Sequence, residues 1–255
     1  ALVFVLARPI VAAKMWLQLG VVAKVLGLLI FNLIFYTGLW FEKPVMVQHG
    51  IYGGFFLVLA LILVFGRRVV PMFLERGLNL SQRLPNYRWI DRSSLVLYLV
   101  FFVTEVFWPG SRWAALCAGA LAIVLFVRVI AWYRSGIWRQ PLLWSLYVAF
   151  VFIAVGFGLR ACEYFVPWIH FIVLHVWSVG GIGLVSMGMM ARVTLGHTGR
   201  NVYDPPASLL VGLFLLLACA LVRVLLPLLW SAHYAWWIGL AQVLWVGAFA
   251  IFVWS

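Results

Sequence analysis

The sequence predicts an all-α protein, a polytopic transmembrane helix bundle of about eight spans plus a partial amino-terminal helix. Apolar residues make up 67% of the 255 positions and charged residues only 9%, whereas soluble domains hold about half and a quarter. The mean hydropathy is +1.12. Apolar runs close to the roughly 20 residues that a membrane-crossing helix needs recur along the chain. We therefore expect one transmembrane helical domain over 1–255.

The predicted elements follow the apolar runs in order. Residues 1–13 are too short to cross a bilayer alone and are predicted to end a helix that leaves the membrane near Arg8 and Lys14. Pro141 suits the first turn of its helix. The chain begins without Met and ends inside an apolar run, so we expect a fragment of a longer protein. Spans are predicted at 18–40, 46–66, 93–108, 113–133, 141–163, 168–192, 206–229 and 233–255.

The basic residues alternate between loops, which gives the predicted orientation. Of the 18 Lys and Arg residues, all except Lys43, Arg112, Arg160 and Arg223 fall on one side of the predicted bundle. The positive-inside rule makes that side cytoplasmic, and the last span ends there. The longest connection, about 74–92, lies on the same side.

The net charge of +12 does not indicate a nucleic-acid partner, because no single face or tail collects it. The expected partner is the lipid bilayer, with other membrane proteins or a second copy of the chain as candidates. The three cysteines lie in separate apolar segments, and neither CxxC nor CxxCH occurs, so they are predicted to be small buried apolar residues. The sequence also lacks a nucleophile triad, a phosphate loop and a zinc protease motif.

The histidines are the candidate ligands, because an ionisable group inside a span is functional by default and imidazole commonly binds haem iron and copper. His49, His170 and His233 lie near the outer ends of predicted spans, His175 lies deeper, and His197 lies at the cytoplasmic exit. His170 and His175 are about 140° apart on a regular helix, so they do not share an ion. A partner of His175 must come from another helix, and His49 is the candidate. The competing interpretation of His175 is a neutral core residue with a hydrogen bond across helices.

Other residues around His175 have two interpretations as well. Gly180, Gly181 and Gly188 face away from it, where small residues let another helix approach. Met189 offers a soft ligand for copper but lies about 21 Å along the axis from His175, and methionine in a membrane helix is more often packing. Arg160 and Glu163 are one turn apart and are expected to pair. The alternative is that Arg112, Arg160 and Arg223 face haem propionates.

Three stretches occur in a fixed order along the chain: GRRVVPMF at 66–73, WRQPLLW at 138–144 and VLHVWSVGGIGLVSMGMMARVTLGHTGR at 173–200. Together they resemble the NnrS family, bacterial membrane proteins that carry haem and copper and are linked to nitric oxide stress, and the stretch at 173–200 is the strongest match. The resemblance covers almost the whole chain. It implies roles for His175, Arg192, His197 and Arg200. The sequence departs from the family in lacking its amino-terminal HxHE-type motif and its polar carboxyl tail, and in having Tyr147 where the family tends to have His.

The function expected from the resemblance is that of a multi-pass protein of the bacterial inner membrane that binds haem b and copper in the response to nitric oxide and nitrosative stress. His175 is the expected haem or metal ligand with His49 as partner, and His170 and His197 are further metal candidates. Arg192, Arg200 and Met189 complete the motif. The alternatives are a metal or small-solute transporter, which should show two related halves, and a structural membrane subunit. No catalytic residue is assigned.

Overall fold

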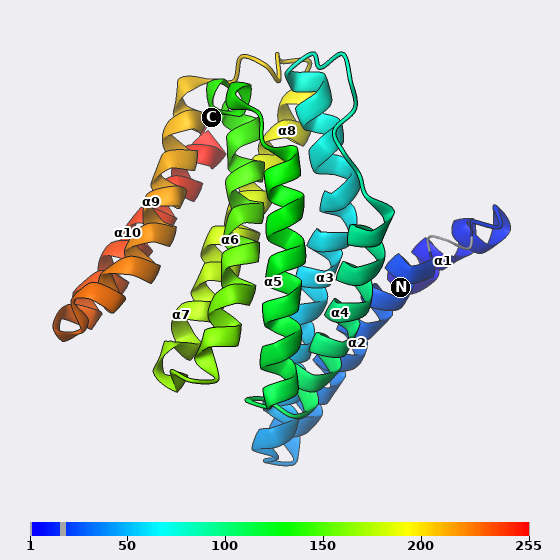
Figure 1. Cartoon of the computed structure of the whole chain (residues 1–255), viewed down its shortest axis with the longest axis vertical. Helices are drawn as coiled ribbons and strands as arrows, with labels where there is room; N and C mark the ends of the chain where they lie inside the picture. Colours follow the sequence, from blue (N-terminus) through cyan, green and yellow to red (C-terminus); the bar gives the residue numbers. More distant parts are fainter. Residues whose placement is uncertain (1, 16–18, 255) are drawn as a thin grey trace.

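Every regular element of the computed structural model, which describes residues 2–15 and 19–254, is helical. Figure 1 shows long helices side by side, with α9 and α10 as a hairpin at one edge and α1 pointing away from the bundle. The helices are α1 (Leu2–Ala12), α2 (Leu19–Trp40), α3 (Pro44–Gly77), α4 (Arg88–Phe107), α5 (Arg112–Trp132), α6 (Pro141–Glu163), α7 (His170–His175), α8 (Leu184–His197), α9 (Ala207–Leu229) and α10 (Tyr234–Trp254).

The predicted class, a polytopic helix bundle, is confirmed. Within the described ranges, seven helical runs are long and apolar enough to cross a membrane. The one predicted span outside these seven, 93–108, corresponds to α4. This helix is long enough to cross a membrane, but every stretch of 18 residues in it contains Asp91, Arg92 and Glu105. It contacts both α3 and α5 in the bundle.

The two ends of the bundle differ in their connections. We call the end with the longer connections, residues 78–87 and 198–206, the loop end; it is at the top of Figure 1. We call the opposite end, with the shorter connections α2–α3, α4–α5, α6–α7 and α9–α10, the turn end. The sequence predicts a connection over about 74–92, and this is wrong, because α3 continues through Pro71 to Gly77 and α4 already begins at Arg88.

Local sequence explains several helix starts. Pro44 and Pro141 occupy the first turns of α3 and α6, where a missing N–H costs nothing. Ser111 caps α5 by accepting a hydrogen bond from the backbone N–H of Ala114 at 3.2 Å. The start predicted for the span at 141–163 is therefore confirmed.

The core lies around α6, which contacts α3, α5, α7, α8 and α9. Trp177 is fully buried there against the rings of Phe56, Phe101 and Phe157, with centroid separations of 5.6, 6.2 and 5.0 Å. Its indole N–H donates to the Ile153 carbonyl at 3.2 Å. Buried aromatic contacts of this kind contribute to packing between the central helices. Trp177 therefore joins the segment after α7 to α3, α4 and α6 through Phe56, Phe101 and Phe157.

Candidate functional site

The site begins with an irregular stretch of the sixth predicted span. Regular helix over 168–192 is expected, but the structure places a short 3₁₀ turn at Pro167–Ile169 and a π-helix at Val176–Gly183 between α7 and α8. The expectation of a regular helix is wrong here, and three glycines lie in the π-helix, where they allow close packing. A Cβ on Gly180 would lie 2.4 Å from the Phe152 ring. The widened backbone therefore approaches α6 closely, and π segments of this kind are frequent at functional sites.

The expected close approach on the face away from His175 is confirmed. A Cβ on Gly181 would lie 2.8 Å from Ile153, and one on Gly188 would lie 2.8 Å from the Ser145 hydroxyl. Both of those neighbours belong to α6. The glycines thus form the contact with α6 and leave His175, the last residue of α7, on another side of the same run.

His175 is held by two hydrogen bonds that fix the state of its ring. Nδ1 lies against the Phe171 carbonyl oxygen, and Nε2 lies 3.0 Å from Nη2 of Arg223 on α9. A carbonyl only accepts and a guanidinium only donates. Nδ1 therefore carries the proton, and the Nε2 lone pair accepts the hydrogen bond from Arg223. This neutral ring with a hydrogen bond to another helix is what the competing interpretation of His175 predicts. Neutral imidazole is also the form that binds a metal, but a metal at Nε2 would have to displace Arg223.

His175 and Arg223 line an open groove of about 260 Å³ between the π segment, α9 and α10. The walls are mainly apolar, with Val179 following His175 by one turn and Ile238 and Trp245 on α10. Two further polar residues line the groove. These are Cys219, whose thiol lies 3.1 Å from the Ala241 carbonyl oxygen, and Gln242.

The structure places the other predicted ligands apart from this groove. His49 is half-buried on α3 and packs against the Phe107 ring at 5.4 Å, away from the residues that line the His175 groove. His197 is exposed at the end of α8. Met189 lines an apolar cavity of about 160 Å³ between α3, α6 and α8.

Arg192 and the GHTGR sequence, which end the stretch at 173–200, take part in helix packing and helix capping. The Arg192 guanidinium lies 3.9 Å from the centre of the Phe73 ring and so joins α8 to α3. Gly199 has φ +70, and the Arg200 N–H donates to the Leu195 carbonyl at 3.0 Å. This is a Schellman-type end for α8, and it explains the GHTGR sequence by helix capping.

A second polar assembly lies toward the turn end, and His170 is part of it. Nε2 of His170 is 2.8 Å from the Tyr52 hydroxyl, and Nδ1 is 2.7 Å from Oε1 of Glu163. The carboxylate accepts, so Nδ1 carries a proton. Both ring nitrogens are engaged, and a metal at His170 would have to displace Tyr52.

Arg160 continues this assembly into the core. The sequence predicts that it pairs with Glu163, and the two are 3.6 Å apart. Its closer partner is Glu105 on α4, which accepts two hydrogen bonds at 2.9 and 2.7 Å. The side chains of Arg160 and Glu105 are 2% and 4% exposed, so Arg160 is turned to Glu105 and not to a surface ligand.

Sequence reasoning missed these partnerships, although one signal was present. The chain has only six Asp and Glu residues, and Glu105 lies inside a predicted span. A carboxylate at that depth needs a cation or a proton. Arg223 also lies inside a predicted span, but only the packing of α9 and α3 shows that Arg223 and Tyr52 are the partners of the two histidines.

Tyr147, which stands where the resembled family tends to have His, is buried in α6 against the rings of Tyr133 and Trp138. Among the described residues, no group of three or more His, Cys, Asp and Glu side chains converges as a metal site. Arg112, the remaining predicted propionate contact, lies 5.0 Å from the Trp113 ring centre.

Comparison with protein families gives one match. The family described as NnrS protein matches residues 1–255, which is the whole chain. Neither the curated proteins nor the solved structures give a match.

Proposed function

Because the chain belongs to the NnrS family, we propose that it is a haem-binding protein of the bacterial inner membrane that acts in the nitric oxide and nitrosative stress response. The observation that carries the proposal is the orientation of His175. Its ring lines an open groove, and its Nε2 accepts from the Arg223 guanidinium that lines the same groove. Family membership and the helix bundle support the membrane location.

The polar groups of the groove suit a haem held by one histidine, and the open groove of about 260 Å³ would cover only part of the macrocycle. The hydrogen bond from Nδ1 to the Phe171 carbonyl keeps the ring in the tautomer that binds iron. Arg223 would release Nε2 and pair with a propionate, since guanidinium and carboxylate bind well as a charged pair. The apolar side chains of Val179, Ile238 and Trp245 would contact the macrocycle. Held by His175, such a haem would supply an iron that can bind nitric oxide.

The resemblance also implies copper. In the described part of the chain, the His175 groove offers two possible copper ligands. His175 and Cys219 both line the groove, and imidazole and thiolate are copper ligands. Because haem and copper would use the same imidazole, we propose haem as the occupant of the His175 groove and make copper an outcome of the test.

The orientation proposed is the one that the basic residues predict. The loop end carries Arg68, Arg76, Arg83 and Arg200, and the positive-inside rule favours the cytoplasm for such an end. The carboxyl end of α10 lies at the same end (Figure 1). We therefore propose a cytoplasmic loop end.

Haem content and metal analysis of purified protein test the proposal, together with a redox-difference spectrum and a nitric oxide titration. We expect a b-type spectrum that shifts with nitric oxide, and we expect His175→Ala to lose it. His233→Ala is the matched control, because His233 is exposed at the turn end. Arg223→Gln should keep the ligand but lower haem retention.

The other outcomes are equally definite. Full haem content and an unchanged nitric oxide response in His175→Ala would reject the site. Bound copper without a haem spectrum would assign the groove to copper. Protein with neither metal would favour the structural-subunit alternative.

A further inference from the structure

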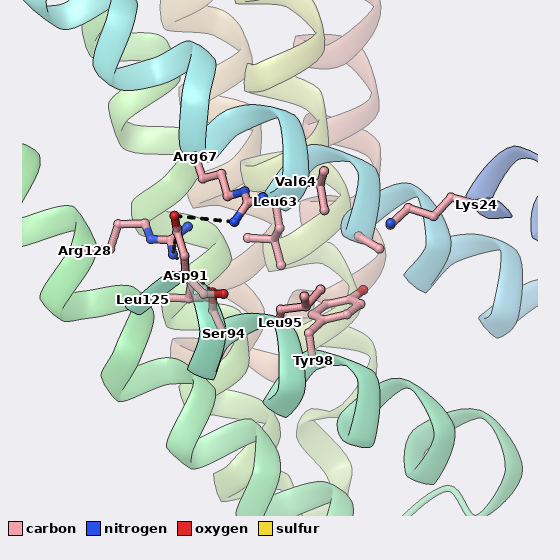
Figure 2. A pocket seen from close by; sticks show the side chains of 11 residues that line it. Lys24, Leu63, Val64, Arg67, Asp91, Ser94, Leu95, Tyr98, Leu125 and Arg128 are labelled. Carbon is pink, nitrogen blue, oxygen red and sulfur yellow. Dashed lines mark hydrogen bonds and ion pairs between the residues drawn. The ribbon is translucent and has the colours of Figure 1, made fainter. Parts of the chain in front are cut away.

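A small cavity near the loop end is lined by three basic side chains and one acidic side chain among the described residues. It lies between α2, α3, α4 and α5 and has a volume of about 50 Å³, enough for a small ion or a few waters. Figure 2 shows Arg67 and Arg128 directed at Asp91, with Lys24 approaching from α2. The apolar part of the wall includes Leu63 and Leu125.

The charges of this cavity do not balance. Among the described residues that line it, Lys24, Arg67 and Arg128 are basic and Asp91 is the one acid. Asp91 already accepts from Arg128 at 2.9 Å and pairs with Arg67 at 3.4 Å. Arg128 is 5% exposed and Arg67 is 25% exposed, so bulk water screens the charge of Arg128 less than that of Arg67. Excess charge inside a membrane bundle is costly unless a counter-charge is near.

The cations also have hydrogen-bond capacity to spare. Nε of Arg67 is buried and has no hydrogen-bond partner among the described residues. The second hydrogen bond of Arg128 goes to the neutral Ser94 hydroxyl at 3.1 Å. The ammonium of Lys24 donates to the Gly20 carbonyl of its own helix at 3.0 Å, and an ammonium has three donors. An acceptor with negative charge would satisfy these groups and the charge balance together.

Arg67 connects the cavity lining to that of a second pocket on the loop-end side. This second pocket is larger, about 510 Å³, and is also lined by Arg68, Arg76 and Arg83. One acid, Glu75, lines that pocket among the residues described there, and its Oε1 accepts from the Leu84 N–H at 2.7 Å. A cleft with one sign of charge concentrates ions of the other sign. Arg67 thus stands between a basic entrance and the small inner cavity.

We propose that the inner cavity binds a small monovalent inorganic anion, of chloride or nitrite size, which enters through the arginine-lined pocket at the loop end. Arg67, Arg128 and Lys24 are the binding residues, and Asp91 holds the two arginines in place. Larger oxyanions and lipid phosphates are expected at the outer pocket, which is wider, with a volume of about 510 Å³. The proposal does not depend on the haem assignment.

Calorimetric unfolding of the purified protein in neutral detergent tests this site. Chloride, nitrite or phosphate replaces gluconate at constant ionic strength and constant pH. A ligand that binds the folded state raises Tm as its concentration increases. We expect chloride and nitrite to raise Tm relative to gluconate, and phosphate to have no effect on the inner site.

The variants separate the inner site from general charge effects. Arg67→Gln should weaken chloride and nitrite binding by roughly tenfold or more, as expected for the loss of one charge-assisted hydrogen bond. Lys24→Gln gives an independent measurement if Arg67→Gln does not fold. Arg139→Gln is the matched control, because Arg139 is an exposed loop-end arginine that lines neither pocket.

Three results would overturn the proposal. The first is equal Tm in gluconate, chloride and nitrite, which would assign the cavity to water. The second is an anion effect that Arg67→Gln and Lys24→Gln leave unchanged. The third is a phosphate effect as large as that of chloride and equally sensitive to Lys24→Gln, since it would contradict the size of the inner site.

Discussion

Arg160 on α6 donates two hydrogen bonds to the Glu105 carboxylate on α4, from Nε at 2.9 Å and from Nη2 at 2.7 Å. Both side chains are nearly inaccessible. Each charge is therefore compensated mainly by the other, with Glu163 3.6 Å from Arg160 as a weaker third member. Such a pair fixes the relation of α4 to α6 more than it adds to stability, because desolvation offsets most of the attraction.

The first prediction concerns this pair. Arg160→Met leaves Glu105 buried without its cation, and we expect a loss of about 3–5 kcal/mol in the free energy of unfolding. Glu105→Leu should cost less, since Arg160 keeps Glu163. The double variant Glu105→Leu/Arg160→Met should be more stable than Arg160→Met alone, because no uncompensated charge remains at that position. Unfolding in detergent, followed by circular dichroism, measures all three. Additive losses would contradict a coupled pair.

The second prediction concerns the packing of Trp177. A Cβ on Gly156 would lie 2.3 Å from the indole nitrogen of Trp177, so Gly156→Ala should lower the free energy of unfolding by about 1–3 kcal/mol. Gly54→Ala is the matched control in another helix, because no atom lies within 4 Å of its added Cβ. It should be neutral or stabilise by up to about 1 kcal/mol. Equal effects of the two substitutions on Tm would show that Trp177 does not need this close approach.

The third prediction concerns the proposed orientation. In a chain whose cysteines are changed to alanine, Ser81→Cys lies in the loop-end connection and Ser231→Cys at the turn end; both positions are exposed. A membrane-impermeant maleimide applied to spheroplasts should label Ser231→Cys directly. It should label Ser81→Cys only after the membrane is permeabilised. The reverse pattern would place the loop end outside the cytoplasm.

The fourth prediction follows from the charge balance at Asp91. Asp91→Asn removes the one acid of the described cavity lining, so the basic side chains should bind an added anion more tightly. We expect chloride affinity, measured from the dependence of Tm on chloride, to rise by roughly tenfold. In gluconate the variant should be less stable than the parent, because Arg67 and Arg128 lose their carboxylate. Unchanged chloride affinity would mean that Asp91 does not compete with an anion.

Much of the fold is predictable from the sequence, because the features that set a membrane span lie within the span itself. A span needs a run of apolar residues, and a helix start needs a cap or a proline, so α5, α6 and α9 fall close to the predicted ranges. The long α3 shows where this reasoning stops. Pro71 is normally a helix breaker, yet α3 continues to Gly77 with Pro71 buried in it. Tertiary packing overrides the local preference there.

The candidate site also has a part that the sequence predicts and a part that depends on contacts between helices. The sequence by itself determined a membrane helix bundle and singled out His175 and its glycine-rich surroundings, because hydropathy, helical periodicity and single ionisable residues are properties of one segment. Only the tertiary structure decided that His175 faces Arg223, that His170 joins Tyr52 to Glu163, and that Arg160 pairs with Glu105. Those partners are separated along the chain, and hydrogen bonds between helices depend on side-chain directions that one helix cannot specify alone. The widened π turn after His175 belongs to the same group, because it forms where α6 packs against glycine.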